Sequence, residues 1–165
     1  MRYFTSIFLC GVLLGVFCNL VFADELLRLN LDNASTVGLH VETDVNNPAE
    51  GQAAVKITTR WPTTVNLAEV DSPDIENATL IYAAKVKTQL EGTAFLEMWA
   101  HVGGGQYFSR GFQSTVGGDS DWKTIQTPFL FQQGQRPEKV TLNLVINGKG
   151  TVWIDDIVLS REPLN

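Results

Sequence analysis

Cysteine is nearly absent from this 165-residue chain, and both cysteines, Cys10 and Cys18, lie within the first 23 residues. The rest of the chain therefore has no disulfide, no cysteine-ligated zinc and no cysteine nucleophile. A small domain without disulfides depends on its hydrophobic core, or on a bound metal, for its stability.

Basic residues are also scarce, because 12 Lys and Arg stand against 18 Asp and Glu, for a formal net charge of −6. Lys and Arg supply most of the affinity of proteins for nucleic acids and anionic membranes. No glycine-rich segment follows a strand and opens a helix, as many phosphate-binding sites require. We therefore expect neither nucleic acid nor a nucleotide as a partner, and we interpret the acidic charge as a source of solubility.

A hydrophobic run long enough to cross a membrane is lacking as well. The apolar stretch Ile7–Phe17 is shorter than the roughly 20 residues that a spanning helix needs. It follows the basic Arg2, and a small residue, Ala23, precedes the charged Asp24, which is typical of a signal peptide. We predict a signal peptide at 1–23, cleaved after Ala23, and one secreted domain, periplasmic or extracellular, at 24–165. A retained N-terminal anchor is the alternative, and cleavage would leave no membrane span.

No segment has a sustained 3.6-residue apolar period, so we expect little helix. Apolar and polar residues alternate instead, in runs separated by turn-forming residues. Breaks are expected at Leu90-Glu91-Gly92, at Gly117-Gly118-Asp119 and at Asn147–Gly150. The chain is predicted to be all-β, a two-sheet β-sandwich of about nine strands, although periodicity alone does not separate a jelly roll from an immunoglobulin-like topology. The expected strands are Leu26–Leu31, Gly38–Glu42, Gln52–Trp61, Ala78–Thr88, Thr93–Val102, Gln106–Val116, Trp122–Phe131, Lys139–Asn147 and Thr151–Ser160.

Three C-terminal segments resemble the galactose-binding-like jelly rolls, the superfamily that includes many carbohydrate-binding modules. They are Trp122–Phe129, the apolar run Val140–Ile146 and the closing segment Trp153-Ile154-Asp155-Asp156-Ile157. The resemblance covers about the last third of the chain. It implies a jelly roll, and it implies a carbohydrate or another extracellular ligand as the partner.

The same resemblance implies one structural calcium ion, because several of these families hold calcium between their first and last strands. Asp155 occupies the matching position, with Asp24, Glu25 and Asp32 as candidate partners near the N-terminus. The alternative is that Asp155 and Asp156 face solvent or accept backbone hydrogen bonds.

A candidate ligand surface lies on the segment Thr93–Val102 and the run after it. Alternation places Phe95, Glu97, Trp99 and His101 on one face of that strand, opposite an apolar face that packs inward. Sugar recognition uses flat aromatic rings and planar polar groups. We therefore predict a binding floor of Glu97, Trp99, His101, Tyr107 and Arg110, with Trp99 or Tyr107 as the aromatic platform. The alternative is a buried Trp99 beside a cross-strand ion pair of Glu97 and Arg110, whereas Trp61, Trp122 and Trp153 are expected in the core or at sheet edges.

Catalysis is not expected. Adjacent residues of a regular strand point to opposite faces, so Asp155 and Asp156 are predicted not to flank one bond as a glycosidase pair does. Glu97 and His101 are four residues apart on a strand, or about 13 Å. The sequence thus predicts a non-catalytic exported binding module for carbohydrate or another extracellular ligand. The alternative is a structural or protein-interaction domain of the cell envelope.

Overall fold

β-Strands make up the regular structure in the described part of the protein. The computed structural model describes residues 23–32 and 41–164, and within these ranges there is no helix. The all-β prediction is therefore confirmed. The strands are β1 (Asp24–Leu29), β2 (Glu42–Asp44), β3 (Ala54–Thr59), β4 (Thr63–Asp71), β5 (Ala78–Val102), β6 (Gly105–Arg110), β7 (Val116–Phe131) and β8 (Lys139–Pro163).

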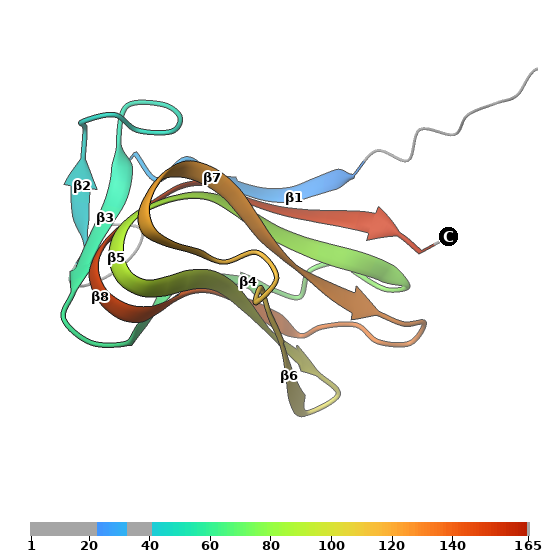
Figure 1. The fold of residues 1–165 in the computed structure, drawn as a ribbon. Helices are drawn as coiled ribbons and strands as arrows, with labels where there is room; N and C mark the ends of the chain where they lie inside the picture. The colour runs from blue at the N-terminus through green and yellow to red at the C-terminus, as the bar shows by residue number, and fades with distance from the viewer. Residues whose placement is uncertain (1–22, 33–40, 165) are drawn as a thin grey trace, which may run out of the picture.

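Two long strands, β5 and β8, organise the fold. Each has 25 residues, and they pair antiparallel from Ala78 opposite Pro163 to His101 opposite Lys139. Both strands bend near their middle, and β7 bends with them, so that one hydrogen-bonded sheet folds over into two layers (Figure 1). The first layer contains β1, the end of β8, the start of β5 and the end of β7, and the second contains β4, the start of β8, the end of β5 and β6.

The hydrophobic core lies between these layers. Side chains of the first layer, such as Leu80 and Leu159, are 0% exposed, and so are Leu96 and Leu142 of the second. All four belong to one continuous apolar cluster. The result is a jelly-roll β-sandwich, as predicted.

Glycines mark the bend. A Cβ on Gly148 would lie 2.1 Å from the carbonyl oxygen of Glu91, and one on Gly92 would lie 2.2 Å from that of Asn147. A Cβ on Gly117 or on Gly150 would likewise lie 2.2 Å from the carbonyl oxygen of a residue on the neighbouring strand. Only residues without a Cβ allow the backbones to approach this closely.

Three of the predicted breaks are wrong in detail, because these glycines bend continuous strands instead of ending them. Ala78–Thr88 and Thr93–Val102 are both part of β5, and Lys139–Asn147 and Thr151–Ser160 are both part of β8. The sequence interpretation also missed β4, which follows directly after Pro62. The described strands therefore number eight, close to the nine expected.

Candidate functional site

The outward face of the second layer carries most of the polar and aromatic side chains singled out from the sequence. The strands lie in the order β4, β8, β5, β6, and one row of cross-strand neighbours runs across all four: Asn66, Asn143, Glu97 and Arg110. The inward neighbours Leu96 and Met98 of β5 are 0% exposed, so strand alternation directs this row away from the core.

Glu97 is the centre of this row and is only 5% exposed. Its carboxylate accepts hydrogen bonds from Arg110 Nε at 2.6 Å, Trp99 Nε1 at 2.7 Å and Asn143 Nδ2 at 3.3 Å. Asn143 Oδ1 in turn accepts a bond from Asn66 Nδ2 at 3.4 Å. A buried carboxylate needs such donors, and here they join four strands into one fixed network.

Aromatic rings surround Arg110. Phe108 packs against Trp99 at 5.1 Å between ring centroids, and Phe112 meets Phe95 edge-on at 4.9 Å. The guanidinium carbon of Arg110 lies 4.6 Å from the Phe108 ring centroid and 6.0 Å from that of Phe112. Phe108 and Phe112 remain 53% and 61% exposed. Arg110 is thus held in one orientation by stacking and by its bond to Glu97.

A groove of about 410 Å³ begins at this cluster. Phe112 and Arg110 line one part of it, and the segment Pro62–Thr64 lines another. Phe95 and Glu97 of β5 and Val145–Asn147 of β8 complete the lining.

Trp61 directly precedes Pro62 of the groove lining, and its side chain is 68% exposed. The hydroxyls of Thr59 and Thr63 donate to the Trp61 carbonyl at 2.7 and 3.0 Å, which fixes the turn that carries the ring. The prediction of a packed Trp61 is therefore wrong. By contrast, Trp122 and Trp153 donate their ring N–H groups to Asn47 and Asp44 beside the edge strand β2, as expected for sheet-edge packing.

The structure brings together three of the five predicted floor residues: Glu97, Trp99 and Arg110. The cross-strand ion pair of the alternative interpretation forms, so Glu97 supports Arg110 and is largely hidden from solvent. His101 lies further along the same face, half-buried and paired with Gln106.

Tyr107 does not belong to this face. It pairs with the inward-facing Ala100 and therefore points to the opposite side of β6 from Phe108. It lines a separate cleft of about 280 Å³ with Phe129 and Leu130. The prediction that Tyr107 lies on the same binding floor as Trp99 is therefore wrong.

Several residues of the face were not found from the sequence: Asn66, Phe108, Phe112 and Asn143. Asn66 lies on the unpredicted strand β4, and Phe112 lies in the loop after β6. Asn143 was open to detection, because it is the polar residue in the middle of the apolar run Val140–Ile146.

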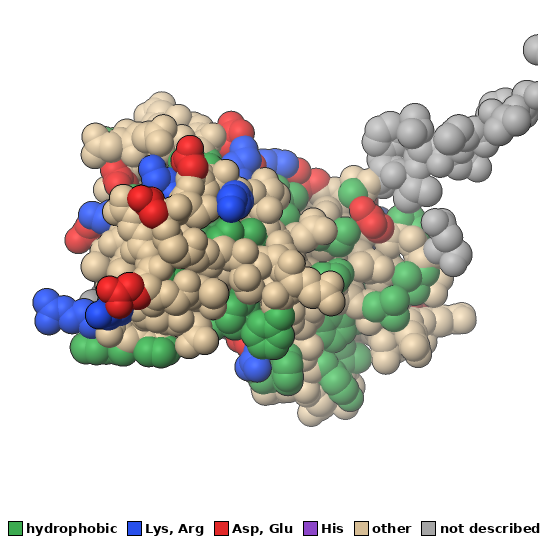
Figure 2. Space-filling model, in the orientation of Figure 1, with side chains coloured by type: hydrophobic (Ala, Val, Ile, Leu, Met, Phe, Trp, Pro, Cys, Tyr) green, Lys and Arg blue, Asp and Glu red, His purple; other side chains and the backbone are tan. Residues whose placement is uncertain are grey.

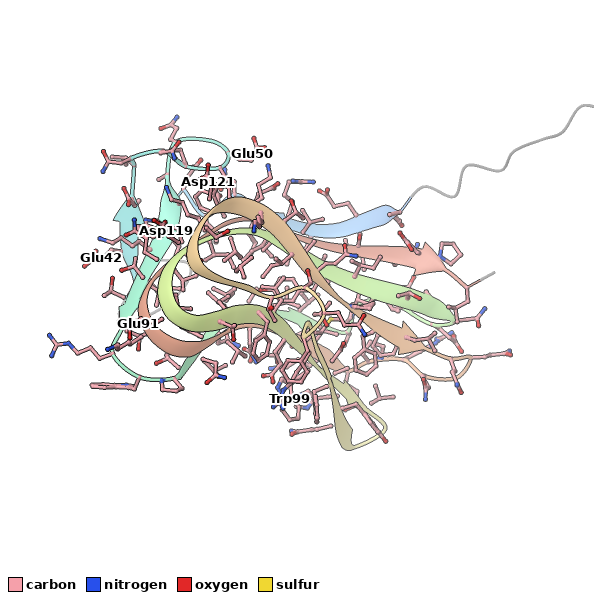
Figure 3. The ribbon with its side chains drawn as sticks, in the orientation of Figure 1. Glu42, Glu50, Glu91, Trp99, Asp119 and Asp121 are labelled. Carbon is pink, nitrogen blue, oxygen red and sulfur yellow. The ribbon has the colours of Figure 1, made fainter. Side chains whose placement is uncertain are left out.

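Hydrophobic side chains gather over β6 and the neighbouring strand ends, in the lower half of the view in Figure 2. Most of the charged side chains visible in that view lie elsewhere. Figure 3 places Trp99 at the base of β6, far from Glu42, Glu50, Glu91, Asp119 and Asp121 at the other end of the molecule. The candidate groove is therefore set apart from much of the acidic charge.

Asp155 of β8 lies on the side of the first layer that faces away from the core, and it is 0% exposed. Its carboxylate accepts three backbone N–H bonds, from Ala49 at 3.0 Å, Glu50 at 2.9 Å and Asp156 at 2.7 Å. Burial raises the pKa of Asp155, and these bonds act against that increase. Calcium requires free oxygen lone pairs, so these surroundings do not fit the calcium site that the resemblance implied. Within residues 23–32 and 41–164, no three His, Cys, Asp or Glu side chains lie together as metal ligands would.

A β-bulge changes the expected geometry of the Asp pair. Between Ala83 and Lys85 of β5 the partner residues on β8 are Val158 and Asp155, so β8 has one extra residue there. Asp156 has a φ of 47°, and Ile154 and Ile157 on either side of the pair are both 0% exposed. Both aspartates therefore lie on the side away from the core, and the prediction of opposite faces is wrong.

The leader prediction falls almost entirely on residues outside the described ranges. β1 begins at Asp24, the residue after the predicted cleavage position. In the described ranges, no helix combines the length and the apolar character of a membrane span.

No family model and no curated protein sequence matches this chain. Solved structures do match its fold. The CBM22-1 xylan-binding domain of Paenibacillus barcinonensis Xyn10C superposes with a TM-score of 0.57 at 14% identity, over 87% of this chain and 97% of that one. A family 16 carbohydrate-binding module gives 0.54 at 14% identity, over 74% of this chain and 86% of that one.

The CBM22-1–GH10 modules of Clostridium thermocellum Xyn10B, solved with xylohexaose, give a TM-score of 0.62 at 12% identity over 87% of this chain and 30% of that one. Identities this low are evidence for the fold alone. This chain therefore has the jelly-roll fold of the carbohydrate-binding modules.

Proposed function

We propose that this protein is an exported, non-catalytic module that binds a neutral polysaccharide in the groove on the outward face of β4, β8, β5 and β6. The observation that carries the proposal is the fixed Arg110 side chain between exposed aromatic rings, at the edge of a groove of about 410 Å³. Two of the matched structures are carbohydrate-binding modules, which supports the same class of function.

The chemistry of the groove suits a sugar chain. The ring of Phe112 lines the groove and offers a flat apolar face for the C–H surface of a pyranose ring. The exposed ring of Trp61, directly before Pro62 of the lining, is a second candidate platform. The terminal nitrogens of Arg110 have no partner within the described part of the chain, so they are free to donate to hydroxyl groups. Glu97 neutralises Arg110, and so the site has no excess charge that would select an ionic ligand.

Preorganisation of the site is expected to lower the entropic cost of binding. Arg110, Trp99 and Asn143 are held by hydrogen bonds to Glu97, so little of their side-chain entropy is lost when a sugar binds. Xylan is named for one matched structure and xylohexaose for another, which makes xylo-oligosaccharides a rational first ligand to test.

A protein partner is the second candidate. Tyr107, Phe108, Phe112 and Leu130 are each more than 50% exposed and lie on both sides of β6. Exposed aromatic clusters of this kind also occur at protein interfaces.

A glycan array and affinity electrophoresis on the full exported domain test the proposal. Phe112→Ala and Trp61→Ala should each weaken binding about tenfold or more. Tyr107→Ala is a matched control, because it removes an exposed aromatic ring from the opposite side of β6. Failure to bind any glycan, or equal losses from Tyr107→Ala and Phe112→Ala, would contradict a glycan groove and favour the protein interface.

A further inference from the structure

The loop between β2 and β3 is fastened to the rest of the sandwich by two carboxylates. Asp155 of β8 accepts the consecutive backbone N–H groups of Ala49 and Glu50, at 3.0 and 2.9 Å. Asp32 accepts those of Gln52 and Ala53, at 2.9 and 3.0 Å. Each carboxylate thereby satisfies two donors of a loop that has few other backbone partners.

Gly51 lies between the two pairs of N–H groups. A Cβ at this position would lie 2.7 Å from an oxygen of Asp32, and the φ of Gly51 is 61°. A side chain would therefore both clash with Asp32 and strain the backbone. The local sequence thus favours the direct bond between the loop and the carboxylate.

A lysine completes the connection. Lys85 of β5 contacts the carboxylate of Glu50 in the loop and lies 3.4 Å from Asp156 Oδ2 on β8. Asp156 also pairs with Arg28 of β1, and Arg28 in turn lies 2.8 Å from Glu25. The two cations and three carboxylates join β1, β5, β8 and the loop. The hydrogen bond that Lys85 donates to Glu50 raises the pKa of Lys85, which agrees with a stable ammonium ion at this place.

We infer that the ammonium group of Lys85 acts as a built-in cation that links the β2–β3 loop to the closing strand, in place of a bound calcium ion. A calcium ion would have to compete with three N–H donors for Asp155 and with Lys85 and Arg28 for Asp156. Both positive side chains would also repel it. Asp156 is 15% exposed in its side chain and Lys85 27%, so solvent screens their attraction less than it does at an open surface.

Thermal melting of the full exported domain, in millimolar calcium and in chelator, tests this inference. The wild-type midpoint should be the same in both conditions, because Lys85, Arg28 and the backbone N–H donors already hold the carboxylates of Asp155 and Asp156. Lys85→Met should lower the midpoint by about 3–6 °C. It should also make the midpoint rise with calcium, because Glu50 and Asp156 then lack their shared cation. Lys123→Met is the control, since Lys123 is exposed on β7 and has no ion pair within the described residues.

Glu50→Gln is a milder second variant, which guards against a Lys85→Met protein that does not fold. It removes the charge of Glu50 from the Lys85–Glu50 ion pair and leaves the ion pair of Lys85 with Asp156. The melting midpoint should therefore decrease less than in Lys85→Met, and it should not respond to calcium. A wild-type midpoint that rises in calcium would overturn the inference. So would a Lys85→Met protein that melts like Lys123→Met, or one that gains nothing from calcium.

Discussion

The Nε atom of Arg110 lies 2.6 Å from Oε2 of Glu97, which links the edge strand β6 to a buried carboxylate of β5. The pair is asymmetric, because the side chain of Glu97 is 6% exposed and that of Arg110 is 39% exposed. Glu97 is therefore the support of the arrangement, and Arg110 is the member that reaches the groove. This division of roles leads to two different expectations for substitutions at the two ends of one ion pair.

Substitution Arg110→Lys should weaken polysaccharide binding with little effect on folding. Lysine keeps the charge but lacks the planar group that stacks on Phe108 and donates in fixed directions. We expect about a tenfold loss of affinity, or about 1.4 kcal/mol, measured by calorimetric titration with the glycan that binds in the array. Arg136→Lys, which alters an exposed arginine paired with Glu76, is the control and should bind as the wild type does. Unchanged affinity in Arg110→Lys would remove Arg110 from the site.

Substitution Glu97→Gln should instead reduce the stability of the whole domain. The amide keeps the shape but loses the charge, and its NH₂ group faces donors from Trp99, Arg110 and Asn143. Leaving buried polar groups without acceptors costs about 2 kcal/mol. Urea denaturation should show this loss, and Glu162→Gln, at an exposed site near the C-terminus, should show almost none. Equal midpoints for the two variants would mean that the network contributes nothing to stability.

The class of fold was predictable because alternation is a local property of the sequence. Leu80, Tyr82, Ala84 and Val86 occupy every second position, with Lys85 and Lys87 on the opposite face, and each of the four is 1% exposed or less. Continuity of the strands was not predictable in this way. Gly92 and Gly148 lie in segments whose residues are typical of turns. Only the pairing of β5 with β8 shows that these glycines let the two backbones approach closely at a bend.

The candidate site was predictable only within one strand and its hairpin. Glu97, Trp99 and Arg110 were identified because strand period and a glycine hairpin place them together. Tyr107 was misplaced although it lies three residues before Arg110, an odd spacing that strand alternation assigns to the opposite face of β6. Pro62 and Phe112 lie on separate segments of the chain, and only the folded chain brings them to one groove.

The bend itself is open to a direct test at Gly148. An alanine there would place its Cβ 2.1 Å from the carbonyl oxygen of Glu91, and the backbone must shift to relieve that contact. We expect Gly148→Ala to destabilise the domain by about 3 kcal/mol or more. Gly104→Ala is the control: its Cβ would have no neighbour within 4 Å, so it carries only the strain of a positive φ, about 1 kcal/mol. Comparable urea midpoints for the two variants would show that the strands do not depend on this close approach.

Tyr82 gives a prediction for the core that also depends on pH. Its ring is 0% exposed, and its hydroxyl has no hydrogen-bond partner among the described residues. A buried hydroxyl without a partner is unfavourable, so Tyr82→Phe should stabilise the domain by about 1 kcal/mol in urea denaturation.

Burial also raises the pKa of Tyr82 far above its ordinary value of 10.0. The folded state therefore keeps its phenolic proton at a pH where the unfolded state has lost it, and stability must fall as the pH rises above about 10. The wild type should lose up to about 1.4 kcal/mol per pH unit in that range from Tyr82, and Tyr82→Phe should lack this part of the decrease. Parallel pH profiles for the two proteins between pH 10 and 11.5 would show that the Tyr82 hydroxyl has access to water or to a partner.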